Sequence, residues 1–293
     1  MKIGSVVVCR NDGYKDFERG IIHFKSMLDT FDEVTYIDWN SPTGSFLWEI
    51  KDQLPKTGKL KHFVIPPNVV NQIITDPKAQ QCNEGLSRNI GIRRSKCDWV
   101  VSTNIDIIPP KRNDLLNILN GLDKNTFYTI SRREAPKEIV YKYGHNNWEM
   151  IREELYDIPE RHFPAMVTPN DHYSLINCCG DFQLAHKDTW DGIRGFEENM
   201  IYACFVDTNV QKKAVLNGYQ LKALYNPPLF HMEHGAYYTK EDGTRVSDKD
   251  NKGAFKGDTK AYNDAWSWVE WFDKSYNEKD WGLNSIEIEY EVI

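Results

Sequence analysis

The chain lacks most features that mark a membrane, secreted or nucleic-acid-binding protein. No apolar run approaches the ~20 residues of a membrane-spanning helix, and the opening M-K-I-G-S-V-V-V-C-R contains no cleavable signal. Six cysteines without a C-x-x-C pair argue against a zinc cage or a disulfide framework. A net charge of −7 argues against nucleic acid as the main partner, because phosphate backbones attract basic surfaces. We therefore expect a cytoplasmic protein with free thiols and no membrane span.

The 293 residues instead show the alternation of apolar runs and amphipathic segments that is typical of an α/β protein. A buried strand over 6–9 runs into the polar turn R-N-D-G, and apolar residues at helical spacing follow over 16–31. Strand, turn and helix in this order open a nucleotide-binding βαβ unit. A second strand over 34–37 ends in Asp38, which either accepts hydrogen bonds from a base or ribose or caps the turn.

The stretch 86–110, L-S-R-N-I-G-I-R-R-S-K-C-D-W-V-V-S-T-N-I-D-I-I-P-P, organises the chain. Ser87 is the expected cap of a helix, Gly91 allows close packing, and a buried strand follows over 99–103. Alternation along that strand would place Asn104 and Asp106 on the same side, at an edge where α/β sheets bind ligands. Two such oxygens suit a divalent cation bridging a diphosphate, although N-x-D is also common turn chemistry.

Several blocks of the sequence follow one another in the order found in GT-A glycosyltransferases, which the chain resembles. The first blocks are the strand ends C-R-N-D and D-W-N-S, the helix L-S-R-N-I-G and the strand end N-I-D-I-I-P-P. The later blocks G-D-F-Q-L, I-R-G-F-E-E-N-M and F-V-D-T-N-V resemble the acceptor half of family-2-like and galactosyltransferase-like members. The resemblance covers residues 3–235 and implies a nucleotide-sugar donor.

The resemblance also implies an architecture. We expect a Rossmann-like GT-A fold with a mixed, mostly parallel central sheet flanked by helices. Residues 1–110 would form the nucleotide-binding half and residues 111–235 the acceptor half, with the charged, aromatic excursion 132–172 assigned to acceptor binding. Residues 236–293 would form a lid-like C-terminal extension that packs on the same domain.

Site residues follow from the same resemblance. Those placed at the nucleotide and donor sugar are Cys9, Arg10, Asn11, Asp38, Arg88, Asn89, Asn104 and Asp181. Arg88 either carries charge to the diphosphate or forms a surface ion pair. Asp106 would hold Mn²⁺ or Mg²⁺, with His231 or His234 completing the shell, and an imidazole ligand favours Mn²⁺. The usual metal motif is Asp-x-Asp, so Asn104 departs from it by offering an oxygen without charge.

The resemblance implies a general base that takes a proton from the acceptor hydroxyl. Asp207 matches that position at the start of an expected helix over 208–217, and Glu197 and Glu198 compete with it. Asp207 equally suits a helix N-cap. The tryptophans considered either as sugar-stacking rings or as core residues are Trp148, Trp190 and Trp266.

The expected protein is thus a metal-dependent, inverting hexosyltransferase. It would move a sugar from a UDP-linked donor to a hydroxyl of a glycan, glycolipid or protein; retention and the oligomeric state stay open. One rival is a sugar nucleotidyltransferase, but C-R-N-D-G-Y-K-D lacks the glycine-rich basic loop of that class. The other rival is a non-catalytic nucleotide- or carbohydrate-binding module in which Asn104 has abolished activity.

Overall fold

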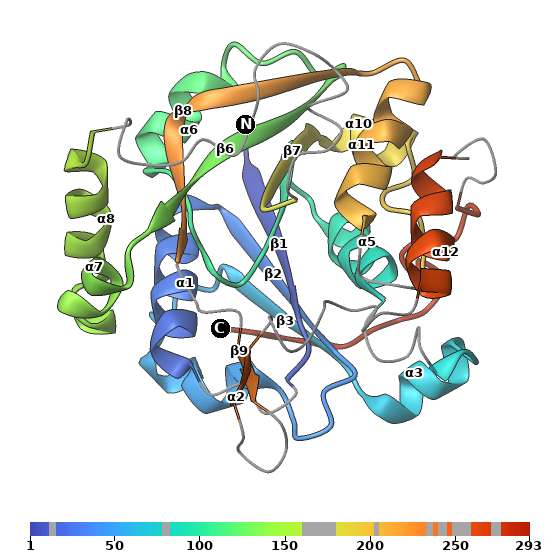
Figure 1. Cartoon of the computed structure of the whole chain (residues 1–293), viewed down its shortest axis with the longest axis horizontal. Helices are drawn as coiled ribbons and strands as arrows, with labels where there is room; N and C mark the ends of the chain where they lie inside the picture. The colour runs from blue at the N-terminus through green and yellow to red at the C-terminus, as the bar shows by residue number, and fades with distance from the viewer. Residues whose placement is uncertain are drawn as a thin grey trace.

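A nine-stranded sheet runs through the centre of the molecule, with helices on both of its faces (Figure 1). The computed structural model describes residues 1–11, 16–77, 83–159, 180–201, 205–232, 237–239, 245–247, 259–270 and 277–293. Within them the strand order is β11-β3-β2-β1-β4-β7-β6-β8-β5. The strands are β1 (Ile3–Cys9), β2 (Glu33–Trp39), β3 (Leu60–Ile65), β4 (Trp99–Thr103), β5 (Ile107–Ile108), β6 (Thr126–Ala135), β7 (Phe182–His186), β8 (Gln220–Met232) and β11 (Tyr290–Val292).

The sheet is mixed, which confirms the α/β class predicted from the sequence. The pairs β1-β2, β1-β4, β2-β3 and β6-β8 are parallel, and the other four pairs of described strands are antiparallel. The sheet is therefore more evenly mixed than the mostly parallel sheet that we expected, because β7 runs against both of its neighbours. A separate two-stranded antiparallel sheet consists of β9 (Tyr237–Thr239) and β10 (Arg245–Ser247).

Helices cover the sheet from two sides, with α1 and α8 on one and α5, α11 and α12 on the other (Figure 1). The helices are α1 (Phe17–Thr30), α2 (Phe46–Ile50), α3 (Pro67–Ile73), α5 (Glu84–Arg94), α6 (Arg112–Leu119), α7 (Lys137–Lys142), α8 (Trp148–Asp157), α10 (Lys187–Gly192), α11 (Val206–Leu216) and α12 (Thr259–Glu270). Two 3₁₀ helices are η1 (Lys51–Gln53) and η2 (His145–Asn147). No helix in the described ranges is long and apolar enough to cross a membrane.

The core lies between the sheet and these helices. On α1, the apolar residues at helical spacing, Ile21, Phe24 and Leu28, are buried against the same face as Val7 of β1. On the opposite face α5 packs closely, because a Cβ on Gly91 would lie 2.5 Å from a methyl group of Val6. The close packing predicted for Gly91 is therefore confirmed.

The start of α5 differs from the prediction. The helix begins at Glu84, and the side chain of Asn83 caps it by accepting a hydrogen bond from the Leu86 N–H at 2.9 Å. Ser87 lies inside the first turns, where its hydroxyl donates to the Asn83 carbonyl at 2.7 Å. The predicted cap at Ser87 is wrong, because asparagine serves as an N-cap as well as serine does and precedes it by four residues.

The end of the chain packs on the N-terminal half. Strand β11 is antiparallel to β3, with Glu291 opposite His62. Arg94 at the end of α5 donates to the carbonyls of Gly282 and Leu283 at 2.5 Å and 2.6 Å. The described residues 277–293 thus complete one edge of the sheet and hold α5 in place.

Candidate active site

A small cavity of about 160 Å³ lies where β4 ends and β7 begins, at the carboxyl edge of the parallel strands. Its walls come from α5, the turn after β4, the start of β7 and the first turn of α11. The lining residues are Glu84, Arg88, Asn104, Gly180, Asp181, Gln183, Phe196 and Asp207. Four residues singled out in the sequence therefore meet at an edge where α/β sheets bind ligands: Arg88, Asn104, Asp181 and Asp207.

Asn104 lies in the turn after β4, and both ends of its amide are bonded. The Arg88 guanidinium donates to its Oδ1 at 2.7 Å, and its Nδ2 donates to Asp181 Oδ1 at 2.7 Å. Arg88 also donates to Ser102 Oγ at 2.8 Å and to the Thr103 carbonyl at 3.1 Å. Arg88 is buried, so it is not the surface ion pair considered from the sequence; it fixes the orientation of Asn104.

Arg132 on β6 connects Asp181 to a second group of polar side chains. Its Nη1 lies 2.5 Å from Asp181 Oδ2, and its Nη2 lies 2.9 Å from Glu134 Oε1. Glu134 Oε2 in turn lies 2.6 Å from His231 Nδ1, while His231 Nε2 lies 3.3 Å from Asp106 Oδ2. A continuous chain of polar contacts therefore runs from the cavity to Asp106.

The pairing of β5 with β8 brings Asp106 and His231 together. Ile107 stands opposite His231 in this pair, and the Met232 N–H donates to the Asp106 carbonyl at 2.8 Å. His231 lies near the end of β8, in an extended segment. Asn104 and Asp106 follow β4 rather than belonging to it: Asn104 binds Asp181, and Asp106 lies in a turn beside His231. That both side chains lie on one side stays a prediction.

A carboxylate and an imidazole, as in Asp106 and His231, are suitable ligands for a divalent cation. Burial acts to lower the pKa of His231, but the hydrogen bond and charge of Asp106, with Glu134, outweigh it and raise the pKa. Glu134 on the other ring nitrogen is the arrangement that orients a metal-ligating histidine. Within the described ranges no group of three or more His, Cys, Asp or Glu side chains is suited to a metal, and His234 lies outside them. The pair fits a cation whose remaining ligands are water and a diphosphate, a mode common for Mg²⁺.

Asp207 reaches the cavity from the first turn of α11. The helix is capped by Phe205, so Asp207 is not the N-cap that the sequence offered as an alternative. Its Oδ1 accepts the Thr208 N–H at 2.8 Å, and the Gly180 backbone also hydrogen-bonds the carboxylate. A Cβ on Gly180 would lie 2.5 Å from the Asp207 Cβ, so a glycine is needed there. Burial raises the pKa of Asp207, which suits a group that must accept a proton near neutral pH.

Glu197, Glu198 and Asn89 do not line the cavity. Glu197 is fully buried and lies 4.0 Å from the buried Lys213 ammonium. Glu198 Oε1 accepts from Asn89 Nδ2 at 2.8 Å and from the Gly282 N–H at 2.7 Å. These three side chains thus face the C-terminal segment and α11, whereas we expected base candidates and a donor contact.

Arg10 and Asn11, which are expected at the nucleotide, connect the end of β1 to the loop that follows β2. Arg10 Nε donates to the Asn40 carbonyl at 3.0 Å, and Asn11 Nδ2 donates to the Gly44 carbonyl at 3.0 Å. Cys9 at the end of β1 is half-buried and stands opposite Asp38 of β2. These contacts shape the edge of the sheet beside the cavity.

Asp38 is buried beneath the loop that follows β2. Burial raises the pKa of its carboxyl, and hydrogen bonds from the Ser41 and Ser45 hydroxyls, Tyr36 and the Phe46 backbone act in the opposite direction. These hydrogen bonds match the turn-capping role considered from the sequence, and contact with a base or ribose stays a prediction. The hydrogen bonds of Asp38 hold the loop that borders the expected nucleotide site.

The sequence analysis missed Arg132, Glu134 and Arg19. Arg132 and Glu134 are two residues apart in the strand T-I-S-R-R-E-A, so alternation puts them on one face, which was the available signal. Arg19 is buried on α1, and its charge interacts with that of Asp106. Trp190, considered as a sugar-stacking ring, is instead core, fully buried and bonded to the Val100 carbonyl at 3.0 Å.

Comparisons with known proteins identify the fold. No protein-family model and no curated protein matches the chain. Solved structures do match, among them S. aureus TarS 1-349 (TM-score 0.48, 14% identity, 79% of this chain and 60% of that chain). The same protein in complex with UDP matches with a TM-score of 0.50 and 13% identity, over 96% of this chain and 68% of that chain. Mannosyltransferase PcManGT from Pyrobaculum calidifontis, in complex with GDP-Man and Mn²⁺, matches with a TM-score of 0.48 and 13% identity, over 78% and 56% of the two chains.

The chain spans about 60% of the length of the first of these structures. At this level of identity the likeness concerns the fold, and the UDP-bound structure carries it over nearly the whole chain. The GT-A fold predicted from the sequence is confirmed.

Proposed function

We propose that this protein is a metal-dependent glycosyltransferase that moves a sugar from a UDP-linked donor to a hydroxyl acceptor with inversion. The observation that carries the proposal is the position of Asp207. This half-buried carboxylate lines a polar cavity at the carboxyl edge of a GT-A sheet. The same edge carries Asp106 and His231 at the far end of one chain of polar contacts.

Among the carboxylates of the cavity, Asp207 is the best placed to act as the base. Asp181 is held by Arg132 at 2.5 Å and by Asn104, and Glu84 lies 3.6 Å from the Arg88 guanidinium. The Asp207 carboxylate accepts hydrogen bonds from the backbone N–H groups of Thr208 and Gly180, and burial raises its pKa. A carboxylate of raised pKa next to open space is the arrangement that general-base catalysis requires.

The reaction then follows one displacement. Asp207 accepts the proton of the acceptor hydroxyl, whose oxygen forms a bond to the anomeric carbon of the donor sugar. The bond from that carbon to the phosphate oxygen breaks, and its electron pair leaves with the nucleoside diphosphate. Attack on the face opposite the leaving group inverts the anomeric configuration. A divalent ion bound by Asp106 and His231 would supply Lewis-acid stabilisation of the leaving diphosphate.

Arg88, Arg132 and Asn104 position this machinery. They hold the Asp181 carboxylate between the cavity and Glu134, and Glu134 holds His231. Because all these groups lie on strand ends, a helix or a short turn of the sheet, the site is built on rigid elements. We assign to Asp181 the role of accepting hydrogen bonds from hydroxyl groups of the donor sugar.

The test uses calorimetry with UDP in the presence and absence of Mn²⁺, followed by UDP release from UDP-glucose, UDP-galactose and UDP-N-acetylglucosamine. Asp207→Asn should lower UDP release by about 10²–10⁴-fold, the usual contribution of a general base. It should leave UDP affinity unchanged, because the amide keeps the shape of the carboxylate. Asp188→Asn, at an exposed carboxylate on α10, is the matched control.

Unaltered UDP release in Asp207→Asn would remove the base assignment. Binding of UDP without Mn²⁺ dependence, combined with no release from any donor, would favour the non-catalytic binding module. Asn104 stands where the usual metal motif has an aspartate, and its amide is already hydrogen-bonded to Arg88 and Asp181. This feature supports the non-catalytic binding module as the second candidate function.

A further inference from the structure

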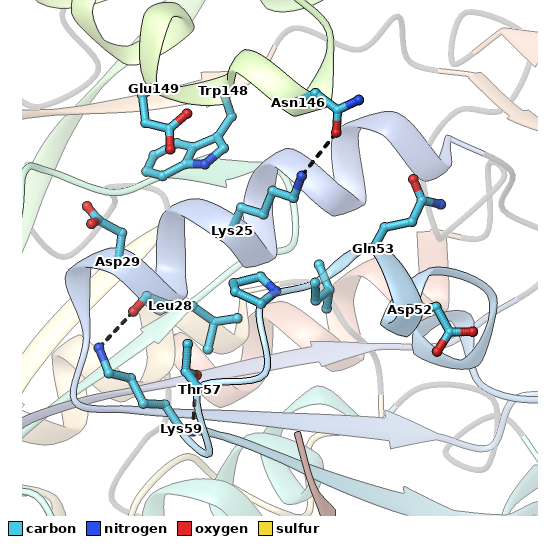
Figure 2. A pocket seen from close by; sticks show the side chains of 12 residues that line it. Lys25, Leu28, Asp29, Asp52, Gln53, Thr57, Lys59, Asn146, Trp148 and Glu149 are labelled. Carbon is cyan, nitrogen blue, oxygen red and sulfur yellow. Dashed lines mark hydrogen bonds between the residues drawn. The ribbon is translucent and has the colours of Figure 1, made fainter.

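A second and larger hollow lies on the outer side of α1, away from the cavity described above. Its volume is about 620 Å³, within the roughly 300–1,000 Å³ of ligand pockets. Three segments form its walls: the second half of α1, residues 52–59 ahead of β3, and the η2–α8 region (Figure 2). The last of these belongs to the excursion that the sequence assigns to acceptor binding.

The walls of this hollow are tied to one another. Lys25 on α1 donates to the His145 carbonyl at 3.2 Å. Figure 2 shows Lys25 also donating to Asn146 Oδ1, at 3.5 Å, and Lys59 donating to the Leu28 carbonyl, at 2.9 Å. On the α8 side, Arg152 binds Asp29 at 2.8 Å. Each wall is thereby fixed to α1, so a ligand would meet a surface that is already ordered.

An apolar base and a polar rim characterise the hollow. Leu28 and Leu54 are buried along its base. Trp148 stands at one side with 6% of its surface exposed and the Arg152 guanidinium 4.8 Å from its ring. Figure 2 shows polar side chains around this base from all three walls. The exposed ones are Asp29, Asp52, Gln53, Thr57, Asn146 and Glu149.

The rim of the hollow carries charges of both signs. Lys25 and Lys59 are directed to backbone carbonyls, and Asp29 is paired with Arg152. No field of a single sign therefore extends over the hollow, which disfavours a phosphate group or a nucleic acid as the ligand. Beside the exposed carboxylates of Asp52 and Glu149, the rim offers neutral amide and hydroxyl groups and paired charges around an apolar base. Such a mixture of donors and acceptors matches a neutral polyhydroxylated ligand.

Two contacts join α1 to the neighbouring α7–η2 region between the hollow and the proposed active site. Glu18 lies 4.0 Å from His145, and Asp16 accepts a hydrogen bond from Tyr141 at 2.8 Å. Asp29 at the hollow and Arg19 beside Asp106 are ten residues apart on α1, which corresponds to about 15 Å along the helix axis. An extended chain of linked sugars can cover such a distance.

We propose that this hollow is a second subsite for the acceptor, which binds a neutral oligosaccharide segment remote from the hydroxyl that reacts. This inference rests on the proposed function, because it names the acceptor as a glycan chain. The hollow would then set the position of the chain while the cavity beside Asp207 carries out the transfer.

The test begins with an array of neutral oligosaccharides probed with the full chain, and continues by calorimetry with the hexasaccharide that binds best. The double variant Gln53→Ala/Asn146→Ala removes exposed hydrogen-bonding groups, and Thr57→Trp fills the hollow. Gln72→Ala, at an exposed glutamine of α3 outside the hollow, is the matched control. Both hollow variants should weaken glycan binding, the double one by roughly tenfold for two lost hydrogen bonds. KM for the acceptor should rise, while kcat and UDP affinity stay unchanged.

Three results would overturn the proposal: no hexasaccharide binds, Thr57→Trp binds the glycan as well as the parent, or Gln72→Ala weakens binding equally. Melting temperatures of the variants show whether each one is folded. The glycan titration needs no donor, so it reads the hollow even if UDP release fails. Conversely, UDP release that responds to Asp207→Asn stands even if the hollow binds nothing.

Discussion

The buried pair of Glu197 and Lys213 offers a test that separates a structural carboxylate from a catalytic one. Both side chains are fully buried, and their charged atoms lie 4.0 Å apart. Burial lowers the pKa of Lys213 from 10.5 to about 8. Keeping this lysine charged at neutral pH therefore costs on the order of 3 kcal/mol, at ~1.4 kcal/mol per pKa unit.

Removing either partner leaves the other charge buried alone. Lys213→Met and Glu197→Gln should each lower the free energy of unfolding, by about 3–5 kcal/mol for the more damaging of the two. The double variant should be as stable as the parent or more stable by up to about 3 kcal/mol, because neither buried charge remains. Glutamine also keeps the Oε1 that accepts from Asn199 at 2.8 Å and 3.1 Å.

The pH dependence gives a second signature. Because the folded pKa of Lys213 is depressed, the unfolded chain binds more protons between pH 8 and 10.5. The Lys213 contribution to stability is therefore fully present above pH 10.5 and is lost as the pH falls through about 8. The free energy of unfolding of the parent, measured against the double variant, should rise with pH across this window by up to ~1.4 kcal/mol per pH unit.

Urea unfolding followed by tryptophan fluorescence measures these free energies, and UDP release measures turnover. We expect the double variant to release UDP within about threefold of the parent, a change worth less than ~1 kcal/mol. A folded double variant without turnover would return Glu197 to the list of bases. Losses that simply add in the double variant would show that the two side chains do not interact.

Further predictions concern the proposed metal and base. Glu134→Gln weakens the support of His231, so Mn²⁺ affinity in the presence of UDP should fall by about 10–100-fold in calorimetry; an unchanged affinity would contradict the orienting role. Gly180→Ala puts a Cβ 2.5 Å from the Asp207 Cβ. A base displaced by ~1 Å costs on the order of 10²-fold, so UDP release should fall while UDP affinity persists; normal release would show that the site accommodates the methyl group. Chelation with EDTA should abolish UDP release, and added Mn²⁺ should restore it; release that survives dialysis against EDTA would exclude a required cation.

The parts of the fold that could be predicted are those whose sequence repeats with a clear period. The apolar spacing in α1 and the apolar run of β4 predicted these elements correctly, because a helix buried on one face and a strand buried on both faces each have a characteristic pattern of apolar residues. The start of α5 was misplaced, since Asn83 and Ser87 satisfy the same capping chemistry. The antiparallel insertion of β7 was not predictable, because strand order depends on contacts between distant segments.

Within the site, residue type and position in the sequence predicted which residues meet better than they predicted which side chains bind one another. Asp106 and His231 meet as expected, because strand pairing joins segments that each end in polar residues. Arg132 was not predicted, because its spacing from Glu134 shows only that the two share a face, and its partner Asp181 lies on a distant segment. Asp207 lies in the cavity only because Gly180, which is far from it in the sequence, leaves room.

The pairing of β11 with β3 has a consequence for the folding of the protein during its synthesis on the ribosome. Val292 pairs with Lys61, so the outer edge of β3 gains its partner only when the last strand has emerged. At ~5–20 residues per second, synthesis leaves that edge open for on the order of ten to fifty seconds. During this interval the nascent sheet exposes unpaired backbone, so chaperone capture or early aggregation should act on this strand first.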